Sequence, residues 1–168
     1  DGAFFRGQTV AVIGGGNTAL QDAVLLSDGC EKVYIVQNLP HLTGEEKLRK
    51  ILAERPNVEI LYCSVVEKII GNQTLSAIEI SNTESGEKRH LKVDGMFVCI
   101  GQQPSNEAFS DLVELDLGGY VKAGEECTTS DGGILVAGDC RTKTYRQVAT
   151  AIADGATAAL NACRYLDH

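Results

Sequence analysis

Hydrophobic positions in the first third of the chain follow two alternating patterns. Short continuous apolar runs predict buried strands, and apolar residues recurring roughly every three to four positions predict amphipathic helices. The expected strands are 8–14, 32–36 and 58–63, and the expected helices are 17–27 and 45–55. Pro56 ends the second helix. The order β-α-β-α-β predicts an α/β fold with a parallel sheet and right-handed crossovers.

The pattern changes after residue 63, where apolar and polar residues begin to alternate. The alternating segments are 64–70, 75–81 and 88–93. Turn-forming residues separate them, so we expect a three-stranded antiparallel β-meander. The segment 95–100 is apolar on both faces, which favours a return to the parallel sheet. Together these segments predict a Rossmann-like, three-layer domain that ends near residue 101.

The rest of the chain has a different pattern. Residues 102–131 are rich in loop-forming residues. Residues 134–137 form a short apolar run, which predicts another buried strand. Small residues recur through 146–166, which predicts a long helix at the end of the chain. This half of the sequence therefore supplies one expected strand and one expected helix, joined by loops.

A run of glycines joins the first expected strand to the first expected helix, and it is the most informative motif of the chain. The residues are Gly14-Gly15-Gly16-Asn17-Thr18-Ala19, which fit the pattern G-x-G-x-x-A. Glycine lets the turn adopt φ > 0 and lets a pyrophosphate approach the backbone, while the first N–H groups of the helix point at the phosphate. A tight turn without a ligand is the alternative, but the flanking strand and helix favour a dinucleotide site.

Composition and charge narrow the function further. The formal net charge of −8 argues against nucleic acid or an anionic membrane as the main partner, and no apolar run approaches a membrane span. The six cysteines form no C-x-x-C, so neither a zinc site nor a redox pair is visible and no metal is expected. They are typical of small buried hydrophobes in a reducing cytosol, which predicts a cytoplasmic protein. The chain starts at Asp1 without an initiator Met, and we expect it to be part of something longer.

The segments 1–5, 12–19, 98–101, 133–139 and 145–149 form a set of motifs with a definite order and spacing. In that order and spacing they resemble bacterial low-molecular-weight thioredoxin reductase, and the chain resembles that family from end to end. Asp1-Gly2-Ala3-Phe4-Phe5 resembles the segment after the family's redox C-x-x-C, and residues 12–19 resemble its NAD(P)H turn. Val98-Cys99-Ile100-Gly101 resembles the return to its FAD domain. Residues 133–139 and 145–149 resemble its second FAD signature.

The resemblance implies a division into two domains. Residues 1–101 match the NAD(P)H-binding domain, and residues 102–168 match the C-terminal half of a discontinuous FAD-binding domain. The family's first FAD glycine motif and its C-x-x-C belong before the position of Asp1, so this chain alone is expected to be inactive. Asp1 itself matches the catalytic acid that assists proton transfer beside the redox cysteines.

The resemblance also implies cofactor-binding residues outside the glycine turn. Asp139, after Gly138, would hydrogen-bond the ribitol of FAD, with an ordinary polar turn as the alternative. The helix that begins near Gln147 would present its first amides to the flavin and stabilise the anion of reduced flavin. The remaining matched positions are Ile100, Gly101, Arg146 and Val148.

The end of the second expected strand decides which nicotinamide cofactor fits. The family's NADPH pattern is H-R-R with a later Arg, and this chain has Gln37-Asn38-Leu39 and Thr43 at those positions. The 2′-phosphate of NADPH would lose its charge-assisted contacts, so NADPH is disfavoured. Gln37 or Asn38 can still hydrogen-bond the ribose 2′-hydroxyl of NADH. A plain strand-ending turn and a domain without nicotinamide stay open as alternatives.

These observations predict part of a flavoprotein oxidoreductase. The resemblance implies that electrons pass from a nicotinamide or another donor through FAD to a redox disulfide and then to thioredoxin, in a parent protein that is a homodimer. A ferredoxin-dependent reductase or a ferredoxin–NADP reductase of the same fold is the first alternative, with ferredoxin as the partner. A non-catalytic nucleotide-binding module is the second.

Overall fold

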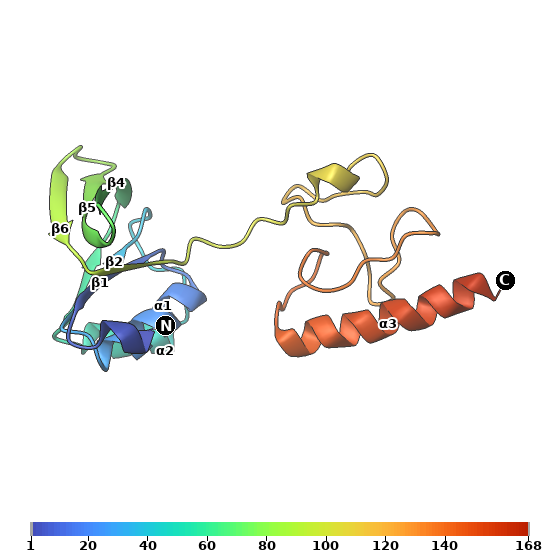
Figure 1. The fold of residues 1–168 in the computed structure, drawn as a ribbon, viewed down its shortest axis with the longest axis horizontal. Helices are drawn as coiled ribbons and strands as arrows, with labels where there is room; N and C mark the ends of the chain where they lie inside the picture. The colour runs from blue at the N-terminus through green and yellow to red at the C-terminus, as the bar shows by residue number, and fades with distance from the viewer. Residues whose placement is uncertain (1, 168) are drawn as a thin grey trace. The chain divides into compact units, whose positions relative to one another are not determined.

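The computed structural model describes residues 2–167, and the chain divides into two compact units, Asp1–Gly101 and Gln102–His168. The first unit holds all but one of the strands and helices labelled in Figure 1. Its elements in chain order are η1 (Gly2–Phe5), β1 (Thr9–Ile13), α1 (Asn17–Ser27), β2 (Lys32–Val36), α2 (Glu46–Ala53), β3 (Val58–Leu61), β4 (Ser64–Gly71), β5 (Leu75–Asn82), β6 (Lys88–Lys92) and β7 (Gly95–Val98).

A four-stranded parallel sheet forms the centre of the first unit. Its strand order is β3-β2-β1-β7, so β1 lies between β2 and β7. Ile13 is opposite Val36 on one side and Val98 on the other, which brings the carboxyl ends of three strands together. The predicted parallel sheet and the return of the seventh strand to it are confirmed.

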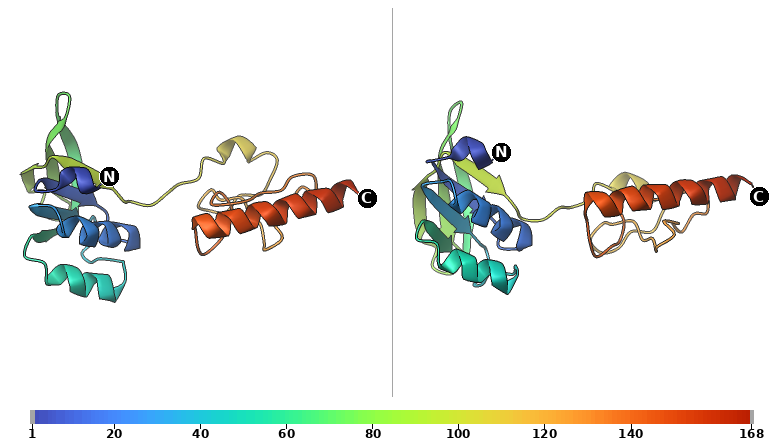
Figure 2. Two further views of the ribbon diagram at one scale, coloured as in Figure 1. Left: turned by 60° about the horizontal axis from the view of Figure 1, so that its bottom comes forward. Right: turned by 90° about the horizontal axis from the view of Figure 1, so that it is seen from below.

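The side chains of this sheet alternate between two cores, as the period of a strand requires. Val33 and Ile35 of β2 belong to the core under α1 and α2, together with Leu20. Tyr34 and Val36 of the same strand belong to the core under the antiparallel sheet. Helices therefore cover one face and the second sheet covers the other, which confirms the predicted three layers (Figure 2).

The second sheet is the predicted antiparallel meander, with strand order β4-β5-β6. Ile78 and Ile80 of β5 face the parallel sheet and are almost fully buried. Each aliphatic side chain buried in this way contributes about 1.5–3 kcal/mol. Bulges between Val66 and Lys68 and between Ile70 and Gly71 interrupt the ladder of β4, the meander strand that lines the site described below.

The second unit contains a short 3-10 helix, η2 (Glu107–Phe109), and one long helix, α3 (Val148–Leu166). The predicted strand at 134–137 is wrong: Leu135 forms only an isolated bridge with Thr128. A strand needs a neighbour along its length, and within residues 102–167 only isolated bridges occur. The predicted helix also starts two residues too early, because Gln147 is the N-cap of α3 rather than part of it.

Little of the second unit is buried. Its core consists of Val113, Val121 and Val136, with a few half-buried residues around them. Along α3 the only buried residue is Asp154, although most of the helix is apolar. Among residues 2–167, no helix is both long enough and apolar enough to cross a membrane.

Candidate nucleotide-binding site

The glycine turn lies where the carboxyl ends of β1, β2 and β7 meet. Gly14 has φ of +123°, and a Cβ there would collide with the backbone carbonyl of Cys99. The Gly14 amide donates to the carbonyl of Val36 (2.8 Å), and the Cys99 amide donates to that of Ile13 (2.8 Å). Both the backbone conformation and the close approach of β7 therefore require glycine at this position.

The turn is also tied to the loop that follows β2. The carbonyl of Gly15 accepts hydrogen bonds from the amides of Thr43 and Gly44, each at 2.9 Å, and from the Thr43 hydroxyl at 3.2 Å. Asn17 accepts a bond from the Glu45 amide at its Oδ1 (2.7 Å). These bonds fix the loop against the start of α1.

The N-terminus of α1 is open to an anion. Gly16 is its N-cap, makes no side-chain cap, and is followed by no acidic residue in the first turn. The first intrahelical bond runs from the Leu20 amide to the Gly16 carbonyl, so the amides of Asn17, Thr18 and Ala19 have no acceptor inside the helix. Ala19 is fully buried in the helix–sheet core, where helix and strand pack closely.

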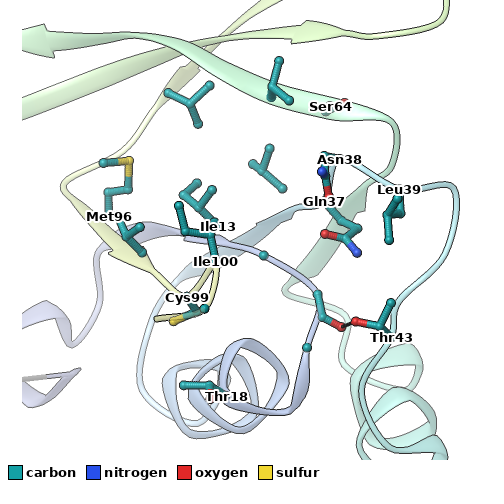
Figure 3. Close-up of a pocket in the computed structure, with 18 of the residues that line it drawn as sticks. Ile13, Thr18, Gln37, Asn38, Leu39, Thr43, Ser64, Met96, Cys99 and Ile100 are labelled. Atoms are coloured by element: carbon teal, nitrogen blue, oxygen red, sulfur yellow. Dashed lines mark hydrogen bonds between the residues drawn. The ribbon is translucent and has the colours of Figure 1, made fainter. Parts of the chain in front are cut away.

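A cavity of about 770 Å³ opens beside this turn (Figure 3). Its walls come from the glycine turn, the end of β2, the strand β4 and the end of β7. Apolar side chains line most of it, including Val66, Met96 and Val98. Among residues 2–167 that line the cavity, Glu67 is the only charged one, and no Lys or Arg contributes. The site therefore combines helix amides that can bind an anion with lining side chains that are neutral or acidic.

Most of the residues predicted for a nucleotide meet in this cavity. Gly14, Gly15, Gly16, Asn17, Thr18, Gln37, Asn38, Ile100 and Gly101 all line it, whereas Ala19 does not. Ile100 is 73% exposed at its edge, and Gly101 has φ of +98°. The contribution of β4 was not predicted, because it depends on how the meander folds over the parallel sheet and has no local sequence signal.

Gln37 and Asn38 differ sharply in their surroundings. Asn38 is exposed, but Gln37 is only 4% exposed, and its Nε2 donates to the carbonyl of His41 (3.1 Å). Gln37 also packs against Gly15, where an added Cβ would lie 2.6 Å from the Gln37 amide. With one N–H of Nε2 donated to His41, the Gln37 amide keeps its second N–H and its Oε1 for other partners.

Cys99 lines the same cavity and is held as a neutral thiol. Burial and a hydrogen bond from its Sγ to Asp22 Oδ2 (3.3 Å) raise the pKa of Cys99 to about 11. Because the thiolate is the reactive form of cysteine, Cys99 is a poor nucleophile at neutral pH. Its thiol hydrogen is already donated to Asp22, so Cys99 contributes only to the shape of the cavity.

The second unit brings together the residues predicted for the flavin. Gly138 has φ of +85°, and the guanidinium of Arg146 donates from Nε to the carbonyl of Asp139 (3.3 Å). Arg146 also stacks on the ring of Tyr120, 3.9 Å from its centroid. Gln147 and Thr150 form a capping box at the start of α3, whose first residue is Val148. The predicted catalytic residue Asp1 lies outside the described residues.

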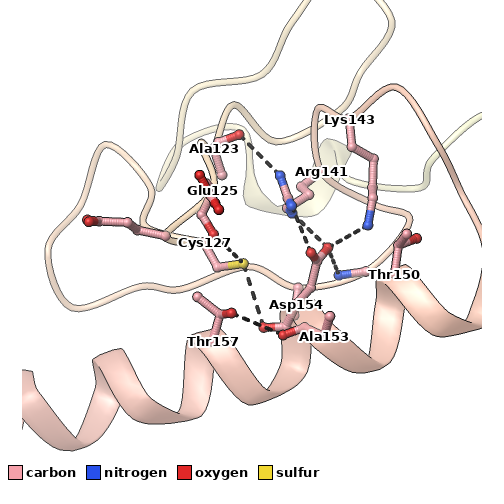
Figure 4. A network of polar contacts seen from close by, with 12 residues as sticks. Ala123, Glu125, Cys127, Arg141, Lys143, Thr150, Ala153, Asp154 and Thr157 are labelled. Atoms are coloured by element: carbon pink, nitrogen blue, oxygen red, sulfur yellow. Dashed lines mark hydrogen bonds and ion pairs between the residues drawn. The ribbon is translucent and has the colours of Figure 1, made fainter.

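A buried ion network that the sequence did not reveal holds this region together (Figure 4). Asp154 of α3 pairs with Arg141 through two bonds of 2.7 and 2.8 Å and with Lys143 at 2.7 Å. The Gly138 amide donates to the same carboxylate at 3.0 Å. Arg141, followed by Lys143 and Gly138, holds the pKa of Asp154 well below its usual range. The only available sequence signal was a single acid inside an alanine-rich helix.

Comparison with known proteins decides the family. Residues 3–155 match the family model described as "Pyridine nucleotide-disulphide oxidoreductase". The chain belongs to the pyridine nucleotide-disulphide oxidoreductase family. Curated relatives include thioredoxin reductase of Coxiella burnetii, 35% identical over 99% of this chain and 55% of that protein. NADH dehydrogenase of Bacillus subtilis is 36% identical over 99% of this chain and 33% of that protein.

Solved structures similar to this chain include thioredoxin reductases as well. Thioredoxin reductase of Lactococcus lactis matches with a TM-score of 0.84 and 32% identity, over 99% of this chain and 55% of that one. Thioredoxin reductase of T. acidophilum matches with a TM-score of 0.81 and 30% identity, over 99% of this chain and 55% of that one. The resemblance to thioredoxin reductase inferred from the motifs is confirmed. The chain spans about half the length of the thioredoxin reductases it matches.

Proposed function

We propose that this chain is the nicotinamide-nucleotide-binding part, together with a portion of the FAD-binding domain, of a flavin-dependent disulfide reductase of the thioredoxin reductase type. The observation that carries the proposal is the open N-terminus of α1, which follows a glycine turn and lines the 770 Å³ cavity. Backbone amides at a helix start bind phosphate through hydrogen bonds and the helix dipole. The family match makes a dinucleotide the fitting ligand.

Each part of the cavity has a role in this proposal. Gly15 and Gly16 let the pyrophosphate approach the backbone, and the amides of Thr18 and Ala19 donate to it. The end of β2 faces the adenosine ribose. The apolar wall around Met96 and Ile100 excludes water from the rest of the nucleotide. Cys99, held as a thiol, takes no part in covalent chemistry.

NADPH is disfavoured as the electron donor. A 2′-phosphate is normally held by arginine, and within residues 2–167 no cationic side chain lines the cavity. The one charged side chain among these lining residues, Glu67, is an acid that offers a phosphate no hydrogen-bond donor. A relative whose name is NADH dehydrogenase supports NADH as the donor. NADH is therefore the nicotinamide cofactor that we propose for the parent protein.

The residues of the second unit fit one edge of an FAD site. Asp139 is exposed, and it lies beside Arg146 at the start of α3, so a carboxylate and helix amides are available together. FAD, when bound, supplies two-electron transfer between a nicotinamide and a disulfide. In this proposal Asp139 accepts a hydrogen bond from the ribitol, and the first amides of α3 orient the flavin ring. Asp154 keeps the loop of Gly138 against α3.

The relatives named thioredoxin reductase support thioredoxin as the protein partner, in preference to ferredoxin. On this proposal the parent passes electrons through its flavin to a redox disulfide and then to thioredoxin. A cytoplasmic homodimer is the setting that we propose for it.

One pair of variants tests the nucleotide site. Thr18→Glu places a carboxylate in the first turn of α1, where it suits the helix dipole but repels a pyrophosphate. Gln21→Glu adds the same charge to an exposed position one turn later. We expect Thr18→Glu to weaken NADH binding by calorimetry about tenfold or more, with about twofold or less for Gln21→Glu. Equal effects of the two variants would refute the proposed phosphate site.

A further inference from the structure

The side chain of Asn17 joins the start of α1 to the start of α2. Its Oδ1 accepts a hydrogen bond from the backbone amide of Glu45 (2.7 Å), and its Nδ2 donates to Glu45 Oε1 (3.4 Å). A backbone N–H can only donate, so the oxygen end of the Asn17 amide must face it. Glu45 is the N-cap of α2 and makes no side-chain cap of its own. Asn17 therefore supplies from another helix the acceptor that a capping box takes from within one helix.

The loop that precedes α2 lies against the glycine turn. The amides of Thr43 and Gly44 both donate to the Gly15 carbonyl, and the Thr43 hydroxyl donates to it as well. Figure 3 shows Thr43 directed toward the turn. An added Cβ at Gly44 would collide with a side chain of α1, so the two segments approach closely. The contact between Asn17 and α2 secures the end of this loop.

The same loop forms part of the cavity wall. Asn38, Leu39 and Thr43 line the cavity, and all three are exposed. Burial does little to hold such residues in place, so the loop depends on how its ends are fixed. A loop that is ordered before a ligand arrives spares the ligand the entropy cost of ordering it. The start of this loop continues from β2, and its end is held through Asn17.

We propose that Asn17 is a positioning residue, whose side chain holds the segment 38–44 in place for the nucleotide instead of binding the pyrophosphate itself. This inference rests on the proposed nucleotide site. The backbone amides at the start of α1 bind the pyrophosphate, and the Asn17 side chain raises the affinity through Glu45. The second N–H of Nδ2 stays available, so a direct contact with a phosphate is the rival role.

A double-mutant cycle separates the two roles, with ADP as the ligand and calorimetry of the whole chain at fixed salt. Asn17→Ala removes both contacts with Glu45 and should weaken ADP binding about fivefold. Glu45→Pro removes the N–H that Asn17 accepts, and proline fits because the φ of Glu45 is −57°. This variant should weaken ADP binding by the same factor. In the Glu45→Pro chain, Asn17→Ala should then add less than about twofold.

Additive effects of the two variants would overturn the inference. A side chain that touches the phosphate loses that contact whether or not residue 45 can donate. An unchanged affinity for ADP in Asn17→Ala would overturn the inference too. Glu45→Gln keeps the backbone N–H and an acceptor for Nδ2, so it should bind ADP at least as well as the unmodified chain does. Asn72→Ala, in the exposed turn between β4 and β5, is the matched control and should change nothing.

Hydrogen exchange of the ligand-free chain gives a second readout, which does not require Glu45→Pro to fold. Asn17→Ala should speed exchange of the Thr43 and Gly44 amides about fivefold or more, because the end of their loop is released. Saturating ADP should slow both amides again. The control Asn72→Ala should leave both unchanged. Equal exchange of these amides in Asn17→Ala and in the unmodified chain would overturn the inference.

The outcomes separate this inference from the proposed function. If none of ADP, NADH and NADPH binds, the nucleotide site is wrong and the inference falls with it. If NADH binds and Thr18→Glu weakens it, but the effects of Asn17→Ala and Glu45→Pro are additive, the site stands and the positioning role of Asn17 falls.

Discussion

The two units of the chain differ in how their apolar residues are used. The first unit buries both faces of its parallel sheet, one under α1 and α2 and the other under the meander. The core of the second unit is a cluster of three buried valines. On α3, by contrast, Val148, Ile152 and Leu160 are each at least 66% exposed. The first unit contains the packing partners of its own strands and helices, and its residues alone line the cavity. The second unit holds its shape largely through polar contacts around one carboxylate.

We expect the largest effect on stability from removing the charge of that carboxylate, which belongs to Asp154. Asp154→Asn should destabilise the second unit by about 3 kcal/mol or more, because Arg141 and Lys143 would remain buried without a counter-charge. Hydrogen exchange of α3 should accelerate, and that of β1 should not. Asp111→Asn, at an exposed position, is the control. It should change the free energy of unfolding that hydrogen exchange reports by less than about 0.5 kcal/mol. Faster exchange in β1 as well would contradict the separation of the two units.

The same network predicts a pH dependence of stability. The folded-state pKa of Asp154 is depressed, so its stabilising contribution is complete above the ordinary aspartate pKa of about 4. That contribution is lost as the pH falls through the lower, folded-state value. Acid should therefore release α3, and Asp154→Asn should remove this part of the acid transition.

A leucine-to-alanine pair compares the two kinds of helix directly. Leu20 of α1 is fully buried and Leu160 of α3 is 66% exposed. Leu20→Ala should destabilise the first unit by about 2–5 kcal/mol, and Leu160→Ala should cost less than about 0.5 kcal/mol. Segment-resolved hydrogen exchange measures both. A large effect of Leu160→Ala would show that the apolar face of α3 is covered in solution.

The smallest expected effect concerns cysteine reactivity. Cys163 on α3 is exposed, whereas Cys99 is half-buried with its pKa raised to about 11. At pH 8 the thiolate fraction of Cys99 should be about a hundredfold below that of an ordinary cysteine, so iodoacetamide should label Cys163 first. Asp22→Asn should speed labelling of Cys99, since Asp22 is the second cause of the shift after burial. An unchanged labelling rate in that variant would mean that burial alone raises the pKa of Cys99.

The contrast between the units also explains what could be predicted from the sequence. The strands and helices of the first unit follow from local patterns, because each element packs against neighbours close in the chain. The strand expected at 134–137 failed because its apolar run has no adjacent strand among the described residues. A pattern of this kind shows that a segment can be buried, but not whether a partner is present.

The same distinction applies to the site. The glycine turn and the absence of arginine at Asn38 and Leu39 are visible in the sequence. The direction of the Gln37 amide is not, since it depends on the carbonyl of His41 four residues later in a folded loop. The contribution of β4 to the cavity and the pairing of Asp154 with Arg141 likewise need the three-dimensional arrangement.

Calorimetry of the whole chain with NADH and NADPH at one salt concentration tests the central claim most directly. The cavity of the first unit offers helix amides for a pyrophosphate, but among residues 2–167 no cationic side chain lines it to hold a 2′-phosphate. We therefore predict that both nucleotides bind weakly and that NADPH binds no better than NADH. A preference for NADPH of about tenfold or more would contradict the account, because it would require a cationic contact that the described residues lining this cavity do not supply.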